Sequence, residues 1–125
     1  MAMYRLLAVA LAALLLSTSA QAHAPQAGPN GGKVIHAGAN YHVELVASGT
    51  TEVVLHLTDM NDKPIAADGY RATAILVVNG QTIRFPMQPG GGSRLVGTAP
   101  VAVPAGVRGA VQITTPQGAT VQARY

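Results

Sequence analysis

Alternation of apolar and polar residues is clearest in residues 41–59, where the sequence reads YHVELVASGTTEVVLHLTD. Val43 and Leu45 alternate with polar neighbours, and a second alternating run follows the SGT segment at 48–50. A period of two indicates a β-strand with one buried face. Glycine between two hydroxyl residues suits a tight turn. The stretch therefore predicts a β-hairpin around which the other strands pack.

Two registers of this hairpin keep its apolar residues on the inner face. A three-residue loop at 48–50 pairs His42 with His56, whereas a register two residues away pairs Glu44 with His56. Only a one-residue slip would exchange the two faces of the strands. In both registers we expect the outer face to gather His42, Glu44 and His56.

Further β-forming runs continue to the end of the chain. Residues 70–78 and 81–87 flank Asn79-Gly80, which is the preferred type I′ hairpin turn. No segment after residue 22 shows a 3.6-residue apolar stripe, so no helix longer than one turn is expected. The pattern predicts an all-β, immunoglobulin-like antiparallel β-sandwich of seven to eight short strands, with a small β-barrel as the alternative. The remaining strand candidates are 33–37, 94–98, 101–105, 107–114 and 119–125.

The first 22 residues have the layout of a cleaved signal peptide. Arg5 precedes an apolar run at 6–16, and Ala20-Gln21-Ala22 fits the small-x-small cleavage rule, which places the cut after Ala22 with a competing site after Ala20. The run is too short to span a bilayer with certainty, so no membrane span is expected in the mature chain. The chain has no cysteine, which excludes a lipoprotein anchor and disulfides. We therefore expect a periplasmic protein made of a signal peptide (1–22), an extended N-terminal segment (23–32) and the β-sandwich domain (33–125).

The charges exclude some function classes. Without Arg5, seven Lys and Arg remain against five Asp and Glu, and they are spread along the chain. Nucleic-acid binders usually cluster basic charge and interleave aromatic residues, so nucleic acid is not an expected partner.

No serine lies in a nucleophile elbow and no cysteine is present. The sequence therefore predicts a protein that is not an enzyme.

Histidines of the predicted hairpin are candidate metal ligands. Neutral imidazole is the commonest ligand for Zn and Cu, and two imidazoles on adjacent strands can share one ion. His42 and His56, with Glu44 beside them, form such a group on the outer face. The alternative is that these side chains are only the solvated face of a sheet.

His23 has a separate claim, because cleavage after Ala22 makes it the N-terminal residue of the mature chain. Its α-amine and ring nitrogen can chelate one ion, an arrangement suited to Cu(II) that a further histidine completes. The alternative is an uninvolved tail residue. Met60 and Met87 are accessory candidates that could add thioether ligands for Cu(I), and His36 is a further accessory candidate.

Three parts of the sequence carry a family resemblance: PNGGKV at 29–34 with YHVELV at 41–46, LTDMNDKPI at 57–65, and GSRLVG at 92–97 with VQARY at 121–125. Together they resemble small periplasmic proteins of proteobacteria and the β-rich N-terminal domain of some periplasmic adaptor subunits of heavy-metal efflux pumps. The resemblance implies a soluble periplasmic protein that binds a heavy-metal ion or assists a heavy-metal efflux system. The rival hypothesis is a structural or protein-interaction module of the cell envelope that binds no metal.

Overall fold

Nine β-strands, joined by turns and loops, lie within residues 25–125, which are the residues described by this computed structural model. The predicted signal peptide and His23 lie outside the described residues. The all-β class is confirmed, and within 25–125 no helix is long and apolar enough to cross a membrane. The strands are β1 (Gln26–Ala27), β2 (Lys33–Ala37), β3 (Tyr41–Ala47), β4 (Thr50–Thr58), β5 (Arg71–Val78), β6 (Gln81–Pro89), β7 (Arg94–Val103), β8 (Arg108–Thr114) and β9 (Thr120–Arg124).

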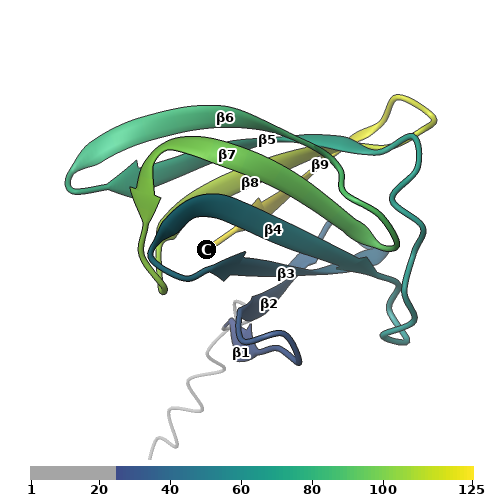
Figure 1. The fold of residues 1–125 in the computed structure, drawn as a ribbon. Helices are drawn as coiled ribbons and strands as arrows, with labels where there is room; N and C mark the ends of the chain where they lie inside the picture. The colour runs from purple at the N-terminus through teal and green to yellow at the C-terminus, as the bar shows by residue number, and fades with distance from the viewer. Residues whose placement is uncertain (1–24) are drawn as a thin grey trace, which may run out of the picture.

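All nine strands belong to one antiparallel sheet in the order β1-β2-β3-β4-β7-β6-β5-β8-β9. Strands β6 and β7 pair only at Gln88↔Val96 and Pro89↔Leu95, and the sheet curls on either side of this junction (Figure 1). The curl brings β9 close to β2, with no ladder between them. The molecule is thus a curled sheet open along one seam, and the sandwich subdivision stays a prediction.

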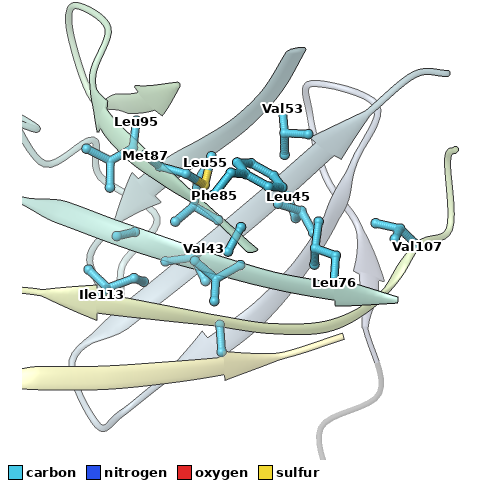
Figure 2. Close-up of a cluster of buried hydrophobic side chains, with 14 of the residues drawn as sticks. Val43, Leu45, Val53, Leu55, Leu76, Phe85, Met87, Leu95, Val107 and Ile113 are labelled. Atoms are coloured by element: carbon cyan, nitrogen blue, oxygen red, sulfur yellow. The ribbon is translucent and has the colours of Figure 1, made fainter. Parts of the chain in front are cut away.

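The inside of the curl is the hydrophobic core. Along most of β3 to β6, alternate residues point inward, as the period of two predicts. Side chains from both halves of the sheet meet there, including Val43, Leu55, Leu76 and Ile113 (Figure 2). Leu55 and Leu76 are fully buried. Truncating either one to alanine removes apolar contacts on all sides and should cost about 2–5 kcal/mol.

The hairpin of β3 and β4 is present, and it adopts the second of the two predicted registers. Glu44 lies opposite His56, so the register that pairs His42 with His56 is wrong. The cause lies at the tip of the hairpin. Thr50 pairs with Val103 of β7 and the ladder is shifted between Thr50 and Glu52, so the tip bends towards β7 and the connection is longer than three residues.

The type I′ turn predicted between β5 and β6 is confirmed. Asn79 and Gly80 have φ values of 52° and 76°, as both central residues of such a turn require. Val78 and Gln81 close the ladder on either side. At the other end of the sheet, Tyr125 follows β9, and its hydroxyl donates a hydrogen bond to the carbonyl oxygen of Val43 at 3.0 Å. Burial, followed by the charge of Glu44, raises the pKa of this phenol.

Candidate metal centre

Two histidine rings meet on the outer face of β2 and β3. His36 lies directly opposite His42 in the ladder. Their Nε2 atoms are 2.9 Å apart, and their ring centroids are 4.4 Å apart. The side chain of His42 is only 16% exposed. The pair is therefore held by two adjacent strands and is largely sheltered from solvent at His42.

Asp62 fixes the orientation of His42 from the other side of the ring. Its Oδ1 atom lies 2.8 Å from Nδ1 of His42, while its own side chain is 78% exposed. Asp62 has a φ of 60°, in the left-handed region that favours glycine. An aspartate in that conformation costs backbone energy, and here it delivers a carboxylate to an imidazole.

The turn that carries Asp62 is held by hydrogen bonds from its own backbone. Oδ1 of Asp59 accepts from the N–H groups of Asn61 at 2.8 Å and Lys63 at 3.0 Å, and these bonds hold the pKa of Asp59 below its usual value. The N–H of Asp59 donates to the carbonyl oxygen of Lys63, and Thr58 forms a bridge with Pro64. Because both ends of the turn are fixed, Asp62 is presented to His42 by a preorganised loop.

These contacts determine which nitrogen of His42 carries a proton. An ionised carboxylate only accepts hydrogen bonds, so Nδ1 of His42 is the donor to Asp62. In the neutral form of His42, Nε2 then carries a lone pair directed at His36, and Nε2–H of His36 donates to it when no ion is bound. A metal ion would replace that proton and receive the lone pairs of both Nε2 atoms.

The separation of the two nitrogens sets the angle at such an ion. With metal–nitrogen bonds of about 2.0 Å, atoms 2.9 Å apart subtend an angle of about 90° at the ion. A linear two-coordinate ion would need a separation of about 4 Å. The pair therefore supplies two adjacent ligands of a four-coordinate ion rather than two opposed ones.

Glu44 has a different task from the one expected of it. It is 3% exposed and accepts three hydrogen bonds, from the backbone N–H of Asn30, the side-chain amide of Asn30 and the backbone N–H of Gly32, at 2.8–2.9 Å. A Cβ at Gly28 would overlap its carboxyl group. Glu44 thus holds the 28–32 turn against the outer face of the sheet.

The remaining candidates lie apart from the histidine pair. His56 lies opposite Glu44 and Arg94 and lines a hollow of about 390 Å³ on the far side of Asp62, which also lines it. Met87 is fully buried in the core, so it cannot bind an ion at the surface. Met60 is exposed, in the same turn as Asp62. His23 lies outside the described residues.

His36 was only an accessory candidate, although the sequence contained a signal for its role. A turn at Gly38-Ala39-Asn40 makes residue 37 the partner of 41 and therefore residue 36 the partner of 42. Within residues 25–125, no group of three or more His, Cys, Asp or Glu side chains is arranged to hold a metal ion. The described part of the chain thus offers two direct ligands, His36 and His42, with Asp62 behind one of them.

No family model matches the chain, and neither the curated proteins nor the solved structures contain a significant match. The resemblance to efflux-adaptor domains therefore stays a prediction, and the functional argument depends on the geometry of the site.

Proposed function

We propose that this protein is a non-enzymatic periplasmic protein that binds one Cu or Zn ion through the Nε2 atoms of His36 and His42. The observation that carries the proposal is the 2.9 Å separation of these atoms in a pair whose second member is oriented by Asp62. A histidine that binds metal commonly donates its other ring N–H to a carboxylate, which fixes its tautomer and makes it a better ligand.

The position of Asp62 supports a functional role over a merely solvated face. A non-glycine residue in the left-handed region costs about 1 kcal/mol, and such strain is concentrated at functional sites. Glycine would relieve it and would remove the carboxylate from His42. At this position the protein therefore carries a residue that is less stable than glycine and whose side chain contacts a candidate ligand.

The angle of about 90° suits Cu(II), which prefers tetragonal sites, and a modest opening of the pair suits tetrahedral Zn. The other coordination positions are open to ligands from outside residues 25–125, including the α-amine and ring of His23 if cleavage occurs after Ala22. Export to the periplasm and a role in heavy-metal efflux are part of the proposal and are supported by the sequence pattern alone.

Calorimetric titration with Cu(II) and Zn tests the proposal, using protein that begins at His23. We expect His36→Ala and His42→Ala each to weaken binding at least tenfold. His56→Ala is the matched control, because it removes a histidine from the same face, and it should change affinity less than about twofold. A form with one extra residue before His23 isolates the contribution of the α-amine. The proposal is wrong if folded, unmodified protein binds neither ion at micromolar concentration, or if His56→Ala weakens binding as much as the other two.

A second variant separates the role of Asp62 from any general effect on folding. Asp62→Gly removes both the strain and the carboxylate, so stability should be unchanged or higher while metal affinity falls about 10-fold or more. Asp62→Asn tolerates the same backbone conformation and removes only the charge, and its affinity should fall as well. Parallel urea denaturation and metal titration measure the two effects. Unchanged affinity in both variants would contradict the orienting role.

One observation favours the rival function, a structural or protein-interaction module of the cell envelope. Strand β9 forms a ladder with β8 on one side only, and its other edge faces β2 across the seam without a ladder. An unpaired edge is where an extended peptide can add as a further strand. This function takes precedence if the folded protein binds no metal.

A further inference from the structure

A second feature of the histidine pair concerns what occupies the open positions of the ion. His36 lines a hollow of about 240 Å³ at the seam where β2 lies close to β9, together with Ile35, Gln122 and Arg124. Arg124 and Gln122 of β9 thus line the same hollow as one of the two ligands. The inference drawn from this arrangement rests on the metal binding proposed above.

The charges around the pair do not balance when a bare ion is bound. Two neutral imidazoles leave both positive charges of a divalent ion uncompensated. Asp62 contributes one negative charge, and Arg124 adds a positive one on the side of His36. A cation bound here is therefore repelled by Arg124, and the ion's own charge dominates the local field.

An anion in the hollow resolves this conflict. Guanidinium groups bind carboxylates through two parallel hydrogen bonds, and the amide of Gln122 offers further donors. A carboxylate held there would lie beside His36, where an oxygen can take a coordination position that the described residues leave open. Its charge would offset both the ion and Arg124.

We propose that the His36–His42 site binds its metal ion together with a small carboxylate co-ligand held by Arg124 and Gln122. The substrate of the site is then a metal–carboxylate complex rather than the free ion. Arg124 acts as the specificity-determining residue for the anionic part of the complex.

The test uses acetate as the probe and Cu(II)-loaded protein, with binding followed by the copper EPR and visible spectra. Acetate should change the spectra of the unmodified protein in a saturable way. Arg124→Gln should weaken acetate binding about tenfold. Arg84→Gln is the matched control, because Arg84 is an exposed arginine of β6, several strands away, and it should leave acetate binding within twofold.

A second measurement separates this role from a structural one. In buffer without carboxylates, Arg124→Gln removes only the repulsion between the guanidinium and the bound ion. The variant should therefore bind copper as tightly as the unmodified protein or more tightly. A variant that had damaged the site would lose affinity under both conditions.

The outcomes distinguish the two proposals. Failure of the folded, unmodified protein to bind either copper or zinc overturns the proposed function and this inference with it. Three results would overturn this inference and leave the proposed function standing. The protein could bind copper without any effect of acetate, or acetate could bind Arg124→Gln as tightly as the unmodified protein. Arg124→Gln could also bind copper more weakly than the unmodified protein in buffer without carboxylates.

Discussion

The clamp formed by Glu44 gives the sharpest stability prediction. Glu44→Ala removes a nearly fully buried carboxylate that accepts three N–H hydrogen bonds from Asn30 and Gly32. Hydrogen bonds to a charged group contribute about 1.5–3 kcal/mol each. Two effects make the net loss smaller than the sum of the three hydrogen bonds. Asn30 is exposed, so its two N–H donors can hydrogen-bond to water in the variant. The variant also avoids the free-energy cost of burying a carboxylate. The expected loss in free energy of unfolding is about 2–4 kcal/mol.

Glu44→Gln tests the same argument with nearly the same side-chain volume. Its carbonyl oxygen can still accept, but its NH₂ group replaces an acceptor and faces an N–H donor. We therefore expect a loss of at least about 1 kcal/mol. Glu52→Ala, which removes an exposed carboxylate from β4, is the control and should stay within about 0.5 kcal/mol.

Urea denaturation measures the stability, and hydrogen exchange of residues 25–32 reports whether the turn stays on the sheet. Glu44→Ala should speed the exchange of the Asn30 and Gly32 amides much more than that of the core strands. A loss below about 0.5 kcal/mol, with both amides still protected, would show that the carboxylate does not hold the turn.

Two other predictions concern the turn at Gly80 and the phenol of Tyr70. Gly80→Val should lower the free energy of unfolding by about 1–3 kcal/mol in urea denaturation, because a β-branched residue resists the positive φ. The added Cβ meets no atom within 4 Å, so the loss comes from the backbone conformation. Gly80→Asn should lose less, and equal losses in the two variants would refute this reasoning. Burial and a hydrogen bond with Tyr41 raise the pKa of Tyr70 to about 12. Between pH 10 and about 12 the unfolded chain therefore releases the proton first, so stability should fall as pH rises, and Tyr70→Phe should flatten this slope in pH-dependent denaturation.

The strands were predictable because their alternation is a local property of the sequence. The register of the first hairpin was not, because the tip at Thr50 is drawn to Val103, which is remote in sequence. The same limit applies to the site. The pairing of His36 with His42 follows from a short local turn and could have been predicted, whereas the burial of Glu44 depends on the 28–32 turn folding over the sheet. The contact of Asp62 with His42 likewise depends on a turn twenty residues away.

The hydrogen bond between Tyr125 and Val43 joins residues 82 positions apart, and β2 meets β9 over a similar span of sequence. Native topology of this kind has a high contact order, because many contacts form only after long segments of chain have been brought together, and such proteins fold in milliseconds to seconds. The seam beside His36 is built from β2, near the start of the described chain, and β9, its last strand. During synthesis it cannot form until β9 and Arg124 have left the ribosome. The hollow at the seam is thus a late product of folding, and an incomplete chain has the paired histidines without the arginine beside them.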